Sequence, residues 1–315
     1  MSMGNQTRST LVIGTRGSQL AIWQAEWVQA QLKQLAPDLT VVLKRIQTSG
    51  DKIQDVPLAK VGGKGLFVKE IEEALLRKDI DLAVHSMKDL PAVLPNGLTI
   101  ICVPEREDPR DALLAHEGKF LDGLPMGARV GTSSLRRQAQ LLHARSDLQI
   151  EMLRGNVDTR LRKLQENQFD AIVLAASGLK RLGWDAHITE CLPIDVCLPA
   201  IGQGALGIEG REDDAFVRSL LARLEHLPTR VTVTAERALL KRLEGGCQVP
   251  IAGHAVLEGE SLTLEGLVVS LDGKRYVRYS LFGSMFEAES IGTKVAEELL
   301  ARGAQPILQE IYGAA

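Results

Sequence analysis

Residues 10–32, TLVIGTRGSQLAIWQAEWVQAQL, combine a short apolar run, a glycine-containing turn and a helical pattern in one continuous stretch. Thr10–Thr15 predicts a β-strand, Ser18 is a suitable N-cap, and the apolar residues that follow recur at helical spacing. The same alternation continues to Pro104, which predicts an α/β sheet. We expect further strands at 39–46, 80–85 and 98–103, and a helix at 66–76.

A second alternating set follows a charged, proline-containing segment at 105–110, which we expect to be a hinge. Residues 198–205 predict a second hinge, so the pattern indicates an α/β protein with two periplasmic-binding-protein-like lobes around a cleft. After 225, a helix, an antiparallel sheet at 251–282 and a closing helix predict a small α+β C-terminal domain. The expected divisions are 8–104 with about 203–225 for the first lobe, 105–202 for the second, and 226–315 for the third domain. Within the second lobe we expect strands at 129–132, 148–153 and 171–175 and helices at 134–144 and 157–166, and beyond it helices at 214–225, 231–243 and 287–302.

The composition argues against several classes of function. A chain of 315 residues is expected to form two or three domains. A net charge of −3 and an aromatic content of 4% argue against a nucleic-acid partner. The four cysteines have neither disulfide-framework nor metal-site spacing, which favours a reducing cytoplasm and no metal. The sequence shows no secretory signal and no apolar run long enough for a membrane partner.

Basic residues gather in the second lobe, where eight lysines and arginines between 129 and 163 face three acidic residues. GTSSLRR at 131–137 and LRGN at 153–156 each run from a strand end into a helix start, a place where backbone N–H groups bind anions. The turn GTRGS at 14–18 is similar. The alternative, a solvated basic face, suits Arg145, Arg162 and Lys163. The expected anion-binding residues are Arg16, Ser18, Thr132, Ser133, Ser134, Arg136, Arg137, Arg154, Gly155, Asn156 and Arg160.

Residues 84–91, VHSMKDLP, place Asp89 at the end of a strand, at the edge of the sheet where catalytic groups tend to lie. In a cleft lined with arginines, one carboxylate is suited to handle a proton or developing positive charge. The alternative is an aspartate that caps a turn. Lys88 is expected to pair with Asp89 or with the ligand, and His85 to be a packed histidine without a role.

Two loops carry further candidate groups. In LEGGCQVP at 243–250, two glycines precede Cys247 and a proline follows it, so the thiol is expected on a loop as a reactive handle. The other cysteines, Cys102, Cys191 and Cys197, are expected to be packed as small apolar residues. Residues 47–65 have little periodicity and predict either a mobile cover that carries Lys60 and Lys64 or a plain surface linker.

Together these segments resemble the porphobilinogen deaminase (hydroxymethylbilane synthase) family. The resemblance runs from about Arg8 to Tyr312, with the motifs in family order and no departure at a motif position. The segments that carry it are GTRGS at 14–18, KVGGKGLFVKE at 60–70, HSMKD at 85–89, EREDPRD at 105–111, GTSSLRR at 131–137, LRGN at 153–156 and LEGGCQVPI at 243–251.

The resemblance implies a monomeric cytoplasmic transferase of tetrapyrrole and haem biosynthesis. Such an enzyme condenses four porphobilinogen molecules head to tail, releases ammonia each time, and yields linear hydroxymethylbilane. It implies that Cys247 holds a dipyrromethane cofactor by a thioether and that Asp89 is the catalytic carboxylate. The resemblance also assigns the arginines, Ser18, Lys88 and Ser134 to carboxylate binding, adds Arg181 to them, and places Gln24, Phe67 and Gln203 near the substrate.

The main alternative is a bilobal binding protein for an anionic solute that performs no reaction. That alternative accounts for the lobes and the arginines. It explains neither Cys247 nor Asp89.

Overall fold

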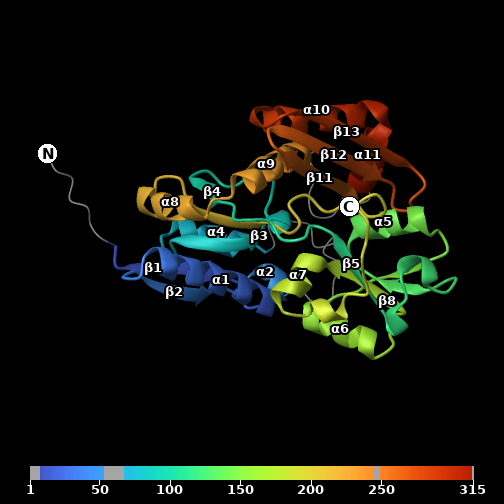
Figure 1. The fold of residues 1–315 in the computed structure, drawn as a ribbon, viewed down its shortest axis with the longest axis horizontal. Helices are drawn as coiled ribbons and strands as arrows, with labels where there is room; N and C mark the ends of the chain where they lie inside the picture. Colours follow the sequence, from blue (N-terminus) through green and yellow to red (C-terminus); the bar gives the residue numbers. More distant parts are fainter. Residues whose placement is uncertain (1–7, 53–66, 244–248, 314–315) are drawn as a thin grey trace.

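The computed structural model describes residues 8–52, 67–243 and 249–313. These residues form three β-sheets and the helices that pack against them (Figure 1). The first lobe is built on a five-stranded sheet of order β2-β1-β3-β10-β4. Strands β1, β2 and β3 are parallel neighbours, whereas β10 runs antiparallel to both β3 and β4. The strands are β1 (Thr10–Thr15), β2 (Thr40–Arg45), β3 (Leu82–Ser86), β4 (Leu98–Cys102) and β10 (Leu206–Arg211).

Helices cover both faces of this sheet. Helix α1 begins as predicted after Ser18, whose side chain accepts a hydrogen bond from the Ala21 backbone N–H. Its buried residues Val28 and Leu32 belong to the apolar core that contains Leu11 and Ile13 of β1. Helix α4 belongs to a second apolar cluster at this sheet. The helices of the lobe are α1 (Gln19–Leu35), α2 (Ser49–Lys52), α4 (Lys69–Leu76) and α8 (Ala215–Leu221).

The second lobe repeats this arrangement with a sheet of order β7-β6-β8-β5-β9. Here β6, β7 and β8 are the parallel neighbours, and β5 runs antiparallel to β8 and β9. Figure 1 shows this lobe in green beside the blue first lobe. Its strands are β5 (Asp111–Ala115), β6 (Arg129–Gly131), β7 (Gln149–Glu151), β8 (Ala171–Ala175) and β9 (Glu190–Cys191), and its helices are α5 (Leu135–Ala144), α6 (Val157–Gln165) and α7 (Ala176–Arg181).

Two segments connect the lobes, the first crossing at 103–110 and the second crossing at 192–205. Each leads directly into the antiparallel strand of the next sheet, β5 or β10. The crossings touch, since the Glu107 N–H donates to the Gly204 carbonyl at 3.2 Å. Gly204 has φ of +89°, and a Cβ there would lie 2.2 Å from the Glu107 carbonyl oxygen, so this close approach needs glycine.

A third sheet, of order β11-β12-β13, forms the C-terminal domain with helices α9 and α10 against it. This domain is drawn in orange and red at the top of Figure 1. The sequence predicted one closing helix at 287–302, but the structure has α10, a π-helical segment at Leu300–Ala304 and a further helix α11. The elements are α9 (Leu227–Arg242), β11 (Ile251–Glu258), β12 (Ser261–Val269), β13 (Tyr276–Ser284), α10 (Ala288–Leu299) and α11 (Gln305–Gly313).

The predicted fold class, two α/β lobes with a small α+β C-terminal domain, is confirmed. Strands β5, β9 and β10 and helix α7 were not predicted, nor was the short helix α2, which lies in the segment 47–65 that was interpreted as a loop. Short 3₁₀ segments complete the described chain: η1 (Met87–Asp89), η2 (His116–Gly118), η3 (Leu121–Gly123), η4 (Asp185–His187), η5 (Ala222–Leu224) and η6 (Met285–Glu287).

None of the helices in the described ranges combines the length and apolar character that crossing a bilayer requires.

One buried carboxylate fastens the C-terminal domain to both crossings. Glu236 of α9 is fully buried, and its Oε1 lies 2.6 Å from Nη1 of Arg106 in the first crossing. Its Oε2 accepts the Gly202 N–H of the second crossing at 2.7 Å, and Oε1 accepts the Ala255 N–H of β11. Burial alone would raise the pKa of Glu236, but the Arg106 charge and the His254 hydrogen bond outweigh it and lower that pKa to about 2.

We expect Glu236→Gln to lower the free energy of unfolding by about 3–5 kcal/mol, because the Arg106 guanidinium would remain buried without its counter-charge. Urea denaturation at pH 7 measures this loss. The control is Glu297→Gln on α10, which removes the exposed pair with Arg242 and is expected to cost less than about 1 kcal/mol. Equal losses in the two variants would contradict the assignment.

Candidate functional site

The predicted catalytic carboxylate lies on a short helix at the end of strand β3. Segment η1, Met87–Asp89, follows the strand directly, and the Met87 N–H donates to the Ala205 carbonyl at 3.0 Å. Met87 is buried, whereas Asp89 and Lys88 are half-buried. The fold therefore anchors this turn through Met87 and leaves Asp89 partly accessible at the sheet edge.

A fully buried carboxylate, Asp111, joins two of the predicted arginines. Its Oδ2 lies 2.7 Å from Nη1 of Arg136, and its Oδ1 lies 2.7 Å from Nη2 of Arg137. Gln203 and the Cys197 thiol also donate to it, at 2.9 and 3.2 Å. Burial alone would raise the pKa of Asp111, but the two guanidinium charges outweigh burial and hold that pKa below its ordinary value. Asp111 therefore stays ionised.

The same network reaches the first lobe through Gln203, which is fully buried in the second crossing. Lys88 Nζ donates to Gln203 Oε1 at 3.2 Å, while Gln203 Nε2 donates to Asp111 and to the Pro109 carbonyl. Burial lowers the pKa of Lys88 to about 8, and the positive charge of Arg137 adds to this, although Asp89 and Asp111 act in the opposite direction. A polar connection thus runs from the Lys88–Asp89 turn to the arginines of the other lobe.

Arg136 and Arg137 are adjacent in the sequence but make different contacts. Arg136 is 4% exposed and donates to the Leu198 carbonyl at 2.7 Å, in addition to its pair with Asp111. Arg137 donates to the Val173 carbonyl at 3.0 Å. Several donors of both side chains therefore already have acceptors within the protein, and their binding of a ligand stays a prediction.

Arg154 and Arg160 carry positive charge that no acidic side chain of the described residues pairs with. Arg160 donates from Nε to the Gly155 carbonyl at 2.8 Å, and Nε of Arg154 is buried without a hydrogen-bond partner in the described part of the chain. Burial and the charges of Arg137 and Arg154 together lower the pKa of Arg160 to about 10, with Asp89 opposing them. The charges of Arg137, Arg154 and Asp89 therefore all act on Arg160, and a bound anion would relieve the repulsion among the three arginines.

The polar residues at the three predicted turns mostly serve the helix starts. Ser134 caps α5 by accepting the Arg137 N–H, as Ser18 caps α1, and Thr132 Oγ1 accepts the Ser134 N–H. An accepting hydroxyl still has its own O–H to donate. Ser133 is exposed, as are Gly155 and Asn156 at the start of α6, and the Asn156 side chain makes no capping bond. Gly155 has φ of +107°, which favours glycine.

Two further contacts connect predicted residues of the first lobe. The Arg16 guanidinium lies over the Phe67 ring, 4.2 Å from its centroid, which is a cation–π geometry. Gln24 is buried on α1 and donates to the Ser86 hydroxyl at 2.9 Å, immediately before the Met87–Asp89 turn. Phe67 and Gln24 thus support Arg16 and the turn.

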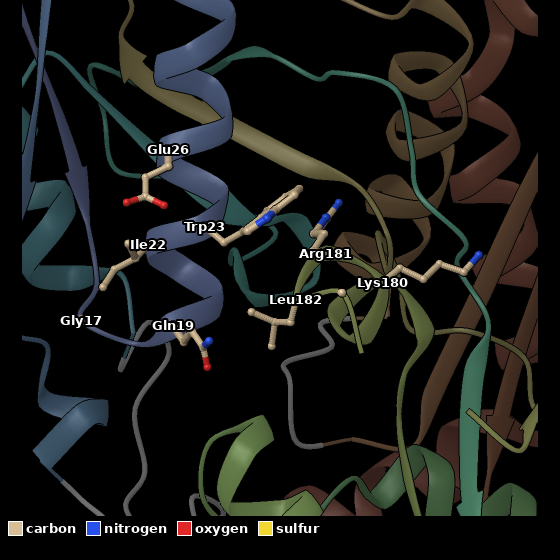
Figure 2. A pocket seen from close by; sticks show the side chains of 9 residues that line it. Gly17, Gln19, Ile22, Trp23, Glu26, Lys180, Arg181 and Leu182 are labelled. Atoms are coloured by element: carbon tan, nitrogen blue, oxygen red, sulfur yellow. The ribbon is translucent and has the colours of Figure 1, made fainter. Parts of the chain in front are cut away.

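A hollow of about 670 Å³ lies between α1 of the first lobe and α7 of the second. Figure 2 shows Trp23 and Glu26 on one side of it and Arg181 and Leu182 on the other. Arg181 donates to the Gly204 carbonyl at 2.6 Å, and burial lowers its pKa to about 10 despite the opposing charge of Glu107. The hollow also reaches Gly17, which lies between Arg16 and Ser18.

The structure adds one site residue that sequence reasoning missed and leaves three predictions outside its range. Asp111 lies at the end of the charged motif at 105–111, which was interpreted only as a hinge. Its position as the first residue of a buried strand was the available signal. Cys247, Lys60 and Lys64 lie outside the described residues. No group of three or more His, Cys, Asp or Glu side chains suited to a metal ion occurs in the ranges that the structure describes.

Comparison with known proteins gives matches over nearly the whole chain. The family model described as "Porphobilinogen deaminase, dipyromethane cofactor binding domain" matches residues 11–219, and "Porphobilinogen deaminase, C-terminal domain" matches residues 230–301. The porphobilinogen deaminase of Syntrophotalea carbinolica is 61% identical over 300 residues, which cover 95% of each chain. That of Geobacter metallireducens is 57% identical over 302 residues, covering 96% of this chain and 95% of the relative.

Solved structures with a similar arrangement are more distant. A putative methionine-binding lipoprotein of Bacillus subtilis has a TM-score of 0.42 at 12% identity and covers 69% of this chain and 90% of its own. The periplasmic aliphatic sulphonate binding protein of Escherichia coli has a TM-score of 0.40 at 15% identity, over 76% of this chain and 71% of its own.

We expect Asp111→Asn to lower the free energy of unfolding by about 3–5 kcal/mol at pH 7, because two buried guanidinium groups would lose their counter-charge. The pKa of Asp111 is lower in the folded chain than in the unfolded one. The difference in free energy of unfolding between wild type and the variant is therefore largest above the unfolded-state pKa, about 4, and declines as the pH falls below it. Denaturant unfolding between pH 3 and 7 measures this. The exposed Asp122 supplies the control, since Asp122→Asn is expected to change stability by no more than about 0.5 kcal/mol.

Proposed function

The chain belongs to the porphobilinogen deaminase family, and we propose that it condenses four porphobilinogen molecules head to tail, with loss of ammonia, into linear hydroxymethylbilane. The observation that carries this proposal is the pair Arg154 and Arg160, for which the described residues supply no ion-paired acidic side chain, together with the charge interaction between Arg160 and Asp89. This arrangement suits a substrate that is anionic at its edges and becomes cationic at its reacting carbon.

The arginines are suited to the carboxylates of the substrate. Each porphobilinogen carries an acetate and a propionate, so the growing chain accumulates negative charge. A guanidinium binds carboxylate through paired N–H donors and stays charged at any working pH. We assign this binding to Arg154, Arg160 and the free donors of Arg137, with Arg16, Ser18 and Lys88 from the first lobe.

We assign the role of catalytic carboxylate to Asp89. Loss of ammonia from the aminomethyl group of porphobilinogen leaves a cation conjugated with its pyrrole ring. A carboxylate beside that ring accepts the pyrrole N–H and stabilises the positive charge as it develops. Deprotonation then restores the aromatic ring. The half-buried position of Asp89 directly after strand β3 supports this assignment.

The residues present fit a covalently held dipyrromethane, because Nε of Arg154 is buried without a hydrogen-bond partner among the described residues and the positive charges around it favour an anionic group. When bound, the dipyrromethane supplies the pyrrole carbon to which the first substrate ring is joined. We assign its thioether to Cys247, which follows helix α9 in the C-terminal domain. A tether of this kind keeps intermediates from diffusing away between rounds.

We further propose that the protein acts as a cytoplasmic monomer without a nucleic-acid or membrane partner, and that Lys60 and Lys64 belong to a cover over the site. The spacing of the cysteines supports the cytoplasm, the net charge argues against a nucleic-acid partner, and the family resemblance supports the monomer. The family motif at 60–70 supports the cover. For the domains we propose the limits 8–104 with about 203–225, 105–202, and 226–315; the position of β10 in the first sheet supports the return at 203.

The intact mass of the protein tests the proposed cofactor. Protein purified from cells that make porphobilinogen is expected to exceed the polypeptide mass by two pyrrole units, and Cys247→Ala is expected to lack that excess. Cys191→Ala is the control, since Cys191 lies on the edge strand β9, and it should retain the excess. A wild-type mass equal to the bare polypeptide would reject the cofactor and would favour the simple binding protein, which releases no ammonia.

Asp89→Asn is expected to retain both the fold and the covalent group but to release ammonia at least about 100-fold more slowly, because the amide cannot neutralise the substrate cation. Single-turnover release of ammonia from porphobilinogen measures this. The exposed Asp79, which pairs with Arg77 at the surface, provides the control variant Asp79→Asn with near wild-type turnover. Normal turnover in Asp89→Asn would reject the role given to Asp89.

A further inference from the structure

Three buried ionisable side chains of the first lobe lie close enough for their charges to interact. They are Glu72 of helix α4, His85 of strand β3 and Glu209 of strand β10. Nε2 of His85 lies 3.0 Å from Oε2 of Glu209. Glu209 is fully buried, and His85 and Glu72 are 5% and 8% exposed. The sequence analysis gave His85 no role, and neither glutamate was named there.

The hydrogen bonding of this group is incomplete. Within the described residues, both carboxylate oxygens of Glu209, Oε1 of Glu72 and Nε2 of His85 have no well-aligned partner, although the His85–Glu209 pair is close. Leaving a buried carboxylate both ionised and unsatisfied is costly. A group of this kind is stabilised when its members share protons.

The surrounding elements supply little further compensation. On β10, Arg211 is engaged by Asp81 and Asp214 and by the carbonyls of Leu75 and Ile80. From α9, the charge of Arg237 interacts with Glu209, but its guanidinium donates to the carbonyls of Pro91 and Ala92. Strand β1 has no ionisable residue and β4 has only the buried Cys102.

Two carboxylates therefore share one nearby imidazole, which favours a proton on one carboxylate. Glu72 is the carboxylate that we expect to carry this proton. Burial and the negative charge of Glu209 together raise the pKa of Glu72 to about 7, and His85 only partly opposes them. At neutral pH the cluster gains or loses a proton.

Helix α4 connects this cluster to the site. Phe67 lies immediately before the helix and packs under the Arg16 guanidinium. One turn further, Glu70 accepts the Ser49 N–H at 2.8 Å and also the Ser49 hydroxyl. Since Glu72 lies on the buried face of the same first turns, its charge affects how closely the start of α4 packs on the sheet.

We propose that Glu72, His85 and Glu209 form a proton-sharing cluster that holds α4 on the first sheet and thereby positions Phe67 against Arg16. Glu72 and Glu209 are then positioning residues for the anion site. Only the part that concerns Arg16 rests on the proposed function. Deprotonation of Glu72 places a second negative charge beside Glu209, weakens the packing of α4 and leaves Arg16 less well oriented.

The direction of the pH effect follows from the raised pKa. Glu72 holds its proton more tightly in the folded chain than in the unfolded one, so stability falls as the pH rises from about 4.5 to about 7 and is then constant. Glu72→Gln resembles the protonated side chain and lacks this dependence. The adjacent Glu73 is exposed and pairs with Arg77 at 3.7 Å, which makes Glu73→Gln a matched control on the same helix.

Urea unfolding of the full chain with its covalent group, between pH 5 and 8.5, tests the cluster. The unfolding constant of wild type relative to Glu72→Gln is expected to rise by up to about tenfold per pH unit up to pH 7 and then to level off. Wild type relative to Glu73→Gln is expected to show no such rise. A ratio for Glu72→Gln that does not change with pH would overturn the proton-sharing cluster.

Steady-state kinetics with porphobilinogen test the positioning. Above pH 7 the KM of wild type is expected to rise relative to that of Glu72→Gln, while the ratio of their kcat values stays constant. A KM ratio that is independent of pH would overturn the positioning of Arg16. Failure of wild type to release ammonia would instead reject the proposed function, and the unfolding experiment would still decide the cluster.

If Glu72→Gln does not fold, infrared spectroscopy of wild type replaces the comparison. The C=O stretch of a protonated, buried carboxylic acid is expected at pH 6 and should be lost by pH 8.5. In Glu209→Gln the midpoint of that loss is expected at lower pH, because the repelling charge beside Glu72 is gone. Absence of a protonated carboxyl band in wild type at pH 6 would overturn the proposal.

Discussion

The carboxylate of Asp111 is the interaction on which the geometry of the site depends. It lies fully buried between the guanidinium groups of Arg136 and Arg137 and accepts a further hydrogen bond from Gln203. Because Gln203 also accepts from Lys88, a single buried charge fixes the start of α5, the second crossing and the Lys88–Asp89 turn relative to one another. The two lobes thus meet through directional polar bonds at the site itself.

The C-terminal domain is attached by the same principle. Glu236 pairs with Arg106 of the first crossing and accepts the Gly202 N–H of the second, so one carboxylate holds both connections. Two charged residues of the segment Glu105–Asp111 therefore bind different domains: Arg106 pairs with the C-terminal domain, and Asp111 pairs with arginines of the second lobe. The two crossings can hold both lobes and the C-terminal domain in place because the charged groups that contact them are buried and paired.

The sequence was a good guide where structure is local. Strand β8 and the cap Ser18 follow directly from an apolar run and from capping chemistry, and the structure has them where they were predicted. The segment 105–110 was interpreted as a hinge from its charge and proline content. The partners of its charges could not be predicted because they are distant in the chain; Glu236 follows Arg106 by 130 residues. Strand β10 was not predicted because the buried charged residues Glu209 and Arg211 interrupt its apolar pattern.

The family motifs named the arginines, but only the structure separates their surroundings. Successive residues of a helix point about 100° apart, so Arg136 reaches the second crossing while Arg137 reaches β8. Asp111 offsets part of their combined charge. The pKa values of Lys88 and Arg160 remain depressed by burial and by the other cations. Under the proposed function, each substrate carboxylate bound there would raise those pKa values again, and relief of the repulsion among the cations would contribute to binding.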